Sequence, residues 1–324
     1  MAEPLTCFSV IVPVYNGSAT LDACLTALVG QDYPREHFEV IVVDDGSTDE
    51  TAQIAAKYAV RLIRLEFNQG RIVARNTGAR AARFETLVFN DARVTPEREL
   101  LAKVGRLKYE PLLADIRDYD DSRWGFARFF YLLRCRLYAP YYPPLKERGD
   151  FWITTENFDR APKGTGCFVC DRGRWIANQP EKSDRETSDD TRILRKIVAT
   201  KPILRTCAAS ARYQQRTDFM AVIPHTFRRG PLFADYYLRP GGRYFVPYAG
   251  LWGFILLSLL LAVLNPWYGV LSAGLALTAL AGVVVYLSRC WSDILVAAVC
   301  LPAVAAAFGL GILKWQVLCF FGKR

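Results

Sequence analysis

The chain has 324 residues, enough for one large domain or two modest ones, with 52% hydrophobic residues and a formal net charge of +9. The apolar residues gather in the C-terminal quarter, whereas the basic residues concentrate in the remainder. This division indicates a soluble part that binds phosphates or anionic headgroups beside a membrane. Without zinc-finger spacing, an RNP-like segment or a basic helical arm, we expect no nucleic-acid partner.

The start of the chain and its cysteines bear on its compartment. Residues 1–6 are polar and unlike a signal peptide, so we expect the N-terminal domain to stay in the cytoplasm. Nine scattered cysteines fit a reducing compartment. Cys167 and Cys170 form a lone C-x-x-C, for which we expect a reduced pair in a strand rather than a metal site.

Strand and helix patterns alternate through the first hundred residues. We expect strands at 8–13, 38–43, 60–65 and 86–89, and helices at 18–30, from 48 or 49 to 59, and at 70–83. Such units predict an α/β fold with a parallel or mixed sheet, which binds ligands at the carboxyl ends of its strands. Polar residues follow the strands there, at Tyr15-Asn16, Asp44-Asp45, Asn68 and Asn90-Asp91.

The middle of the chain, about residues 97–222, has a less regular pattern. Within it, Trp124–Tyr138 mixes aromatic residues with arginines. This mixture fits either an interfacial helix that dips into lipid headgroups or a core helix with snorkelling arginines.

The C-terminal part predicts membrane helices. No charged residue occurs from Tyr244 to Ser288, and two spans fit, at 246–264 and 268–288. A third apolar stretch at 293–313 carries only Asp293 and Pro302 as exceptions. Three such stretches in a row make buried core helices the weaker alternative.

Charged and aromatic residues flank these stretches. Four arginines precede the first span, as is typical of a cytoplasmic side: Arg228, Arg229, Arg239 and Arg243. Four tryptophans resemble interfacial anchors: Trp252, Trp267, Trp291 and Trp315. Three full spans would put Lys314, Lys323 and Arg324 outside, against the charge rule. We therefore expect that the tail lies at the interface or that the third stretch is re-entrant.

Several motifs in the first part resemble the family 2 glycosyltransferases. The match begins with Ser9–Gly17 and Val42–Asp49 and continues through 68–70, 74–78 and 89–93. It covers about residues 7–230, and its order along the chain makes it specific. The resemblance implies a GT-A fold, which is a nucleotide-binding α/β sheet.

The resemblance assigns a nucleotide-sugar site to the strand ends. A carboxylate can accept the N–H groups of uracil or guanine, and the family pattern favours Asp45 for this contact, with Asp44 beside it. Tyr15 would stack on the base, and Pro13 and Asn76 belong to the same site. The alternative is that Asp44–Ser47 is only a turn and helix cap.

One position departs from the family pattern. Asn90–Pro96 stands where the family has Asp-x-Asp, so that Asp91 matches the ribose-binding aspartate and Arg93 replaces the metal ligand. Arginine cannot ligate a cation but can bind phosphate oxygens. Either Arg93 replaces part of the metal's charge, or Asp91 or Asn90 still holds Mg²⁺ or Mn²⁺ with other ligands.

The catalytic base would come from a second acidic motif. Thr187–Leu194 resembles the family's Glu-Asp motif, in which the second acid takes the proton of the acceptor hydroxyl. Asp190 would be this base and Asp189 a supporting residue, and displacement by one base inverts the anomeric centre. The alternative is a helix start whose acids suit the macrodipole.

Two further motifs are less distinctive. Gly164–Phe168 resembles the family's acceptor-site loop or is a plain turn. His225–Gly230 has the spacing of the Gln-x-x-Arg-Trp region of larger synthases, without its Gln and Trp. Arg228 or Arg229 would neutralise the departing diphosphate or anchor headgroups.

Together these features predict a GT-A domain at 1–222, a basic juxtamembrane segment at 223–243 and a transmembrane region of two or three helices at 244–324. The expected activity is transfer of a sugar from a nucleotide diphosphate sugar to a lipid-linked or glycan acceptor at the inner membrane, in cell-envelope polysaccharide synthesis. A processive synthase and a non-catalytic nucleotide-sugar-binding protein are the alternatives.

Overall fold

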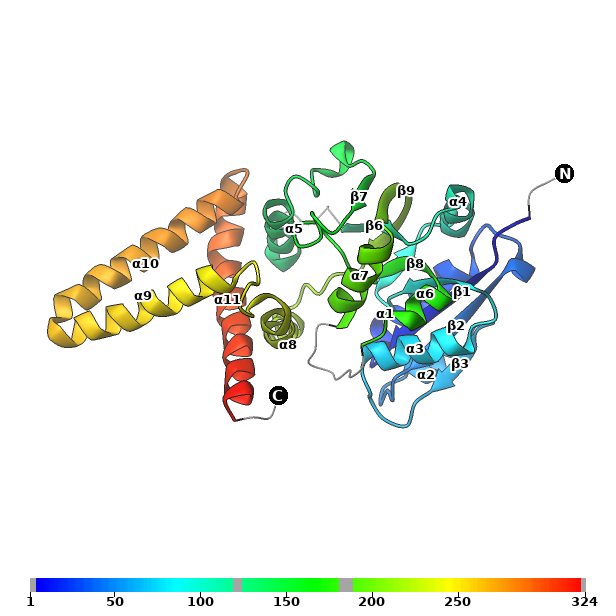
Figure 1. The fold of residues 1–324 in the computed structure, drawn as a ribbon, viewed down its shortest axis with the longest axis horizontal. Helices are drawn as coiled ribbons and strands as arrows, with labels where there is room; N and C mark the ends of the chain where they lie inside the picture. Colours follow the sequence, from blue (N-terminus) through cyan, green and yellow to red (C-terminus); the bar gives the residue numbers. More distant parts are fainter. Residues whose placement is uncertain (1–3, 119–123, 181–188, 322–324) are drawn as a thin grey trace. The chain divides into compact units, whose positions relative to one another are not determined.

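A computed structural model describes residues 4–118, 124–180 and 189–321 (Figure 1). The chain forms two compact units. The first comprises 1–119, 138–185 and 189–215, and the second comprises 120–137, 186–188 and 216–324. The boundary predicted at residue 222 falls within a helix of the second unit, at 219–237.

The first unit is built on a mixed sheet with the order β3-β2-β1-β4-β8-β6-β9-β5, and β7 pairs with β9. The strands are β1 Phe8–Val14, β2 Phe38–Asp44, β3 Arg61–Arg64, β4 Thr86–Asn90, β5 Val94–Pro96, β6 Leu112–Asp118, β7 Phe151–Ile153, β8 Cys167–Asp171 and β9 Ile203–Tyr213. β3, β2, β1 and β4 are parallel, whereas β8 is antiparallel to β4. The predicted α/β class with a parallel or mixed sheet is confirmed.

Six α-helices connect these strands in the described residues: α1 Ser18–Val29, α2 Thr51–Ala55, α3 Arg71–Ala81, α4 Leu100–Leu107, α6 Arg172–Ala177 and α7 Asp189–Thr200. The helix expected to reach residue 59 ends at Ala55. There the amides of Lys57 and Tyr58 bond three residues back, to Ile54 and Ala55, so the chain tightens into a turn.

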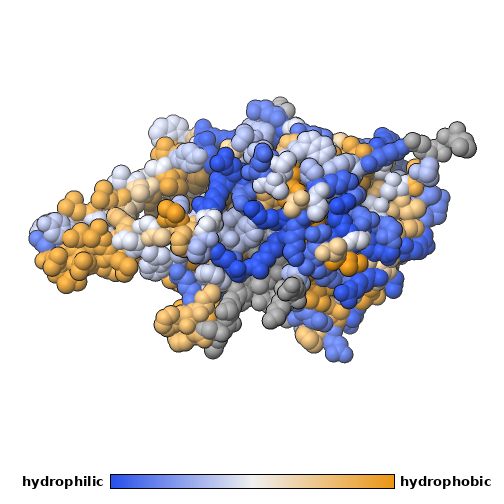
Figure 2. Space-filling model, in the orientation of Figure 1, coloured by the Kyte–Doolittle hydropathy of each residue, from blue (hydrophilic) through white to orange (hydrophobic). Residues whose placement is uncertain are grey.

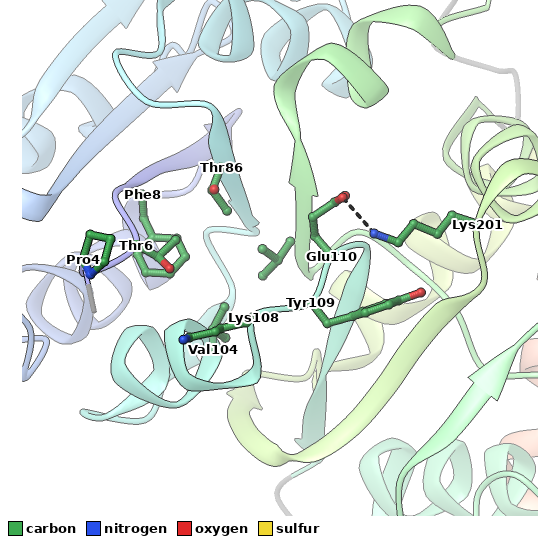
Figure 3. A pocket seen from close by; sticks show the side chains of 10 residues that line it. Pro4, Thr6, Phe8, Thr86, Val104, Lys108, Tyr109, Glu110 and Lys201 are labelled. Carbon is green, nitrogen blue, oxygen red and sulfur yellow. Dashed lines mark hydrogen bonds and ion pairs between the residues drawn. The ribbon is translucent and has the colours of Figure 1, made fainter. Parts of the chain in front are cut away.

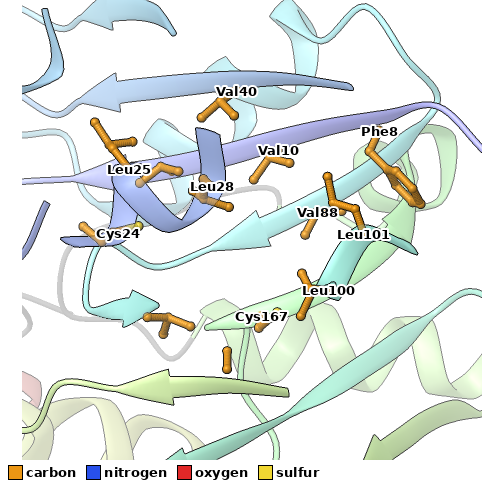
Figure 4. Packing of buried hydrophobic residues seen from close by; sticks show 14 of the residues in the cluster. Phe8, Val10, Cys24, Leu25, Leu28, Val40, Val88, Leu100, Leu101 and Cys167 are labelled. Atoms are coloured by element: carbon orange, nitrogen blue, oxygen red, sulfur yellow. The ribbon is translucent and has the colours of Figure 1, made fainter. Parts of the chain in front are cut away.

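The core of this unit explains why the strands read as continuous apolar runs. β1 is buried along nearly its whole length because helices cover both faces of the sheet. On one face, Leu25 and Leu28 of α1 pack with Val10, Val40 and Val88 (Figure 4). This packing fixes the strand ends, from which the loops of the candidate site extend.

The cysteines are free, as expected. Cys167 and Cys170 lie in β8 and are fully buried. Burial raises the pKa of the Cys167 thiol to about 12, so it remains an uncharged member of the core.

The second unit is helical: α5 Gly125–Leu137, α8 Phe219–Tyr237, α9 Phe245–Leu264, α10 Pro266–Leu287 and α11 Trp291–Phe320. Among the described residues, α9, α10 and α11 are long and apolar enough to cross a membrane. The α9–α10 hairpin presents a largely hydrophobic surface (Figure 2). α11 is one unbroken helix of 30 residues, so the third apolar stretch does not turn back on itself as a re-entrant segment would.

The ambiguous segment around residues 124–138 forms α5, which packs on α11. Phe129 of α5 lies in a buried cluster with residues of α10 and α11. Arg128 donates to Asp293 of α11 through two nitrogens, at 2.8 and 3.1 Å. One face of α5 is therefore covered by protein.

Candidate active site

The candidate site lies at the carboxyl ends of β1, β2 and β4, where parallel pairing places the segments after Val14, Asp44 and Asn90 along one edge. The first two loops are joined by side chains. Asn16, at φ 47°, donates its amide to the Ser47 hydroxyl at 2.9 Å. Its side-chain oxygen accepts from the Thr48 amide at 2.9 Å. The loops that follow β1 and β2 are therefore hydrogen-bonded to each other at the edge of the sheet.

Asp44 and Asp45 are both buried at this edge. Asp44 accepts from the Ser47 amide at 2.9 Å and from the Arg64 side chain at 3.1 Å. Asp45 accepts from the amides of residues 69 and 70, at 2.7 and 2.9 Å, and so holds the start of α3. In this structure both carboxylates perform the turn and helix-start roles that were the alternative, and base contact by Asp45 remains a prediction.

Gly46 is required by the close approach of these loops. Its φ is +74°, and a Cβ there would lie 2.5 Å from the carbonyl carbon of Phe67. Any other residue would strain the turn and displace the segment that Asp45 holds.

Asp91 follows β4 and is held by the backbone. Its amide donates to the Gly166 carbonyl at 2.9 Å, and its carbonyl accepts from the Val94 amide at 2.8 Å. Its carboxylate is 40% exposed. Arg93 donates to the Gln214 carbonyl at 3.4 Å. Both side chains therefore belong to the same sheet edge.

A buried arginine joins the two predicted acidic motifs. Arg75 of α3 donates to Asp91 Oδ1 at 2.7 Å and to Asp190 Oδ1 at 2.8 Å, and its side chain is 2% exposed. Arg71, one turn earlier, lies 3.4 Å from Asp190. Burial lowers the pKa of Arg75, but attraction to Asp190 and Asp91 outweighs burial and leaves its pKa raised.

Neither Arg75 nor Arg71 was predicted from the sequence as a site residue. Arg75 recurs with Ile72 and Ala79 on the buried face of α3, where an arginine needs carboxylate partners. That position, and the place of Arg75 within the 74–78 motif, were the available indications. The structure therefore brings together Asp91 and Asp190, which are 99 residues apart in the chain.

The remaining candidates of the first unit have varied settings. Tyr15 is 47% exposed at the end of β1, so its ring is available for stacking. Pro13 lies within β1, opposite Val43. The Asn76 side-chain oxygen accepts from the Trp175 indole at 2.9 Å. Asn76 thus anchors a core aromatic here, and its predicted contact with the nucleotide sugar remains a prediction.

The acidic motif at the start of α7 is described only in part. Thr187 and Ser188 lie outside the described residues, as does the side chain of Asp189, which begins the helix. Asp190 is partly buried, with its side chain 17% exposed. Its catalytic role and that of Asp189 remain predictions.

The Gly164–Phe168 segment abuts Asp91. A Cβ on Gly166 would lie 2.9 Å from Ile116 and 3.5 Å from Asp91 Oδ2, so a glycine is needed for this segment to pack closely beside Asp91. The Thr165 hydroxyl is buried without a hydrogen-bond partner. Such an orphaned hydroxyl is costly unless something binds it, which fits a segment lining a ligand site.

The basic motif lies on α8, in the second unit. Arg228 and Arg229 are exposed, and Arg228 donates to the Pro224 carbonyl of its own helix at 3.3 Å. Their predicted roles with diphosphate or headgroups remain predictions.

The donor set for a metal is small. No cluster of three or more His, Cys, Asp or Glu side chains occurs in the described parts of the chain. Mg²⁺, however, commonly takes one or two carboxylates and completes its shell with substrate phosphates and water. The exposed carboxylate of Asp91 fits that arrangement.

A pocket of about 500 Å³ lies away from the group formed by Asp91, Arg75 and Asp190 (Figure 3). It is lined by Phe8 and Thr86, which begin β1 and β4, and by Lys108, Glu110 and Lys201. It therefore sits at the amino-terminal edge of the sheet and is separate from the candidate active site.

The mixed sheet flanked by helices is a GT-A-type fold. A solved mannosyltransferase from Pyrobaculum calidifontis, PcManGT in complex with GDP-Man and Mn²⁺, has a similar fold, with a TM-score of 0.55 at 19% identity, over 99% of this chain and 92% of that one. Residues 9–167 match the model of the family described as Glycosyl transferase family 2. The chain therefore carries a family 2 glycosyltransferase domain.

Two relatives add to this assignment. The glycosyltransferase AglE of Haloferax volcanii is 37% identical over 108 residues, which is 32% of this chain and 36% of AglE. The poly(ribitol-phosphate) β-N-acetylglucosaminyltransferase TarS of Staphylococcus aureus is 42% identical over 90 residues, or 26% of this chain and 16% of TarS. The matches thus span about a third of the first relative and a sixth of the second.

Proposed function

We propose that the protein is a membrane-anchored, inverting hexosyltransferase that moves a sugar from a nucleotide diphosphate sugar to a lipid-linked or saccharide acceptor at the cytoplasmic membrane face. The observation that carries the proposal is the link from Asp91 through Arg75 to Asp190 at the carboxyl edge of the sheet. Relatives named for β-N-acetylglucosaminyl and mannosyl transfer support a hexose donor, and they fit a role in cell-envelope polysaccharide synthesis.

The donor would lie across the strand ends. Tyr15 stacks on the base, Asp91 accepts from the ribose hydroxyls, and Arg93 binds the diphosphate through its fork of donors. Asp45 is covered by the amides of residues 69 and 70, so its contact with a base requires that loop to shift.

Asp190 is the proposed general base. It takes the acceptor proton as the acceptor oxygen forms a bond to the anomeric carbon, and the bond from that carbon to the diphosphate breaks with inversion. A carboxylate that is ion-paired with arginines binds a proton less readily. We infer that Arg75 turns to the diphosphate when the donor binds, and that Asp190 is then released to act.

A divalent cation, Mg²⁺ or Mn²⁺, would be held by Asp91 together with diphosphate oxygens. When bound, it would neutralise charge that develops on the leaving diphosphate. Arg93 occupies the position of the family's second aspartate, so this chain supplies one carboxylate there and one guanidinium.

The test uses the full chain in lipid nanodiscs with a panel of UDP- and GDP-sugars and lipid-phosphate, lipid-glycan and soluble saccharide acceptors. Release of nucleoside diphosphate that depends on an acceptor supports the proposal, and Asp91→Asn is the matched inactive control. Donor binding without release for every acceptor would instead support a non-catalytic nucleotide-sugar-binding protein. Products of many sugar units would support a processive synthase.

A further inference from the structure

The two ends of the α9–α10 hairpin, which are the start of α9 and the end of α10, contact α11 at widely separated points. α9 and α10 meet at a tip, where a Cβ on Gly269 would lie 3.1 Å from that of Ala262. They diverge from this tip toward α11 (Figure 1). α9 has 20 residues and α10 has 22, and each is long enough to cross a hydrocarbon core of about 30 Å. A hairpin of this kind crosses the bilayer and returns, so both of its ends lie on one face of the membrane.

Each end of the hairpin packs against a different part of α11. Leu287, the last residue of α10, shares a buried cluster with Val296 and Cys300 of α11. Tyr248, near the start of α9, packs against a cluster that contains Ile312 of α11. Val296 and Ile312 are 16 residues apart, which is about 24 Å along a helix. Two points at the same membrane depth are thus separated by most of a bilayer's thickness along the axis of α11.

The two arginine-bearing helices of this unit, α5 and α8, also contact α11 at two widely separated points. Arg128 of α5 binds Asp293 near the start of α11. α8 crosses α11 at a glycine pair near its end, where a Cβ on Gly230 would lie 2.7 Å from the carbonyl carbon of Gly311. These contacts are 18 residues apart, or about 27 Å along α11.

α5 and α8 lie on the same face of the membrane. Between them, the described residues contain no helix long and apolar enough to cross. Phe126 of α5 and Phe219 of α8 also pack together, with ring centroids 6.1 Å apart. An α11 that spanned the bilayer would therefore force one of these arginine-bearing helices into or beyond the hydrocarbon.

We propose that the protein crosses the membrane only twice, through the α9–α10 hairpin, and that α11 lies in the plane of the bilayer with α5 and α8 on the face where the β-rich unit lies. The partner of α5, α8 and α11 is therefore the lipid surface. The inference rests on packing within the second unit and is independent of the proposed activity.

The surface of α11 fits this position. Its exposed large apolar residues recur on one side of the helix, opposite the residues that pack on α5 and α8: Trp291, Leu295, Val299, Leu310, Leu313, Val317 and Phe320. Such a stripe suits the boundary between headgroups and acyl chains. With α11 in the plane, Lys314 lies on the same face as Arg239 and Arg243, which removes the conflict of Lys314 with the charge rule.

Native cysteines at both ends of α11 allow a direct test. Cys290 and Cys319 are exposed, Cys7 and Cys207 are partly exposed, and the other five cysteines are buried. With Cys7 and Cys207 changed to serine, two variants keep either Cys290 or Cys319. A third has neither and carries Tyr268→Cys at the hairpin tip, and a fourth carries Lys314→Cys instead. Each full-length variant is treated with a membrane-impermeant maleimide in sealed vesicles of both orientations.

We expect Cys290, Cys319 and Lys314→Cys to label from the face of the β-rich unit, and Tyr268→Cys to label from the opposite face. Labelling of Cys319 or Lys314→Cys from the face of the hairpin tip would show that α11 spans and would overturn the proposal. Failure of both to label from the β-rich face would overturn it too. Labelling of the tip from the β-rich face would show that the hairpin does not cross.

Discussion

Replacing Arg75 tests whether the two acidic motifs form one site. Arg75→Met keeps the length of the side chain but removes two charge-assisted hydrogen bonds, at 2.7 and 2.8 Å, and leaves two carboxylates without their shared cation. Hydrogen bonds to charged groups contribute about 1.5–3 kcal/mol each. Asp91 is 40% and Asp190 17% exposed, so water offsets part of the loss. We expect the free energy of unfolding to fall by about 3 kcal/mol.

The assay has a stability arm and an activity arm. For a unit of this size, about 3 kcal/mol lowers Tm by about 6–12 °C, measured by thermal unfolding of the full chain in nanodiscs. Misplaced carboxylates should reduce kcat/KM for sugar transfer by about 100-fold. Arg75→Lys keeps the charge without the planar fork and should also lose most of the activity.

Two further variants serve as controls for Arg75→Met. Arg71→Met removes a half-exposed contact at 3.4 Å and should change the unfolding free energy by less than about 0.5 kcal/mol. Arg75→Met combined with Asp190→Asn should cost less than the sum of the single changes, by at least about 1 kcal/mol, because the pair interacts directly. Wild-type unfolding and near-wild-type activity for Arg75→Met would refute the link.

Four further outcomes are expected. Gly46→Ala forces a side chain toward Phe67 at positive φ and should weaken donor binding by calorimetry and cost about 1–3 kcal/mol of stability. Burial raises the pKa of Glu110, but bonds from Arg174 and Lys201 outweigh it and leave that pKa lowered; its stabilisation relative to Glu110→Gln should be full above about pH 5 and disappear as pH falls through the lowered pKa. EDTA should abolish transfer, with recovery on Mn²⁺, and full activity in EDTA would leave charge neutralisation to arginine. Asp190→Asn should reduce transfer to hydroxyl acceptors about 10²–10⁴-fold, and a retained rate with phosphate acceptors would indicate that those need no base.

The fold of the first hundred residues follows closely from the sequence because β1, β2 and β4 are buried nearly throughout and helices cover both faces of the sheet. The apolar runs at 8–13 and 38–43 leave little choice of structure, and they appear as β1 and β2. The extra strands β6, β8 and β9 pair antiparallel or over long separations. No local sequence pattern encodes such pairing, so the sequence of residues 97–222 did not predict these strands.

The candidate site was predictable where its residues lie at strand ends, and less so where residues distant in the chain come together. Asp91 was predicted as a site residue because it follows an apolar strand. Arg75 was missed because a helical arginine is ordinarily solvent-exposed, and only the packing of α3 against the sheet buries it. The link between Asp91 and Asp190 depends on where α7 returns to the sheet, and no spacing within either motif specifies that return.

The arginines of this edge connect the metal question to the Arg75 experiment. Arg71, Arg75 and Arg93 outnumber Asp91 and Asp190, so the cluster carries one net positive charge before a donor binds. An aspartate in place of Arg93 would make it −1, and a divalent cation would be needed to restore the balance. While Arg75 occupies Asp91, a cation competes with a buried guanidinium for that carboxylate. A diphosphate that attracts Arg75 frees both carboxylates at once, Asp91 for a cation and Asp190 for the acceptor proton, so metal binding and base activation should both depend on the donor arriving first.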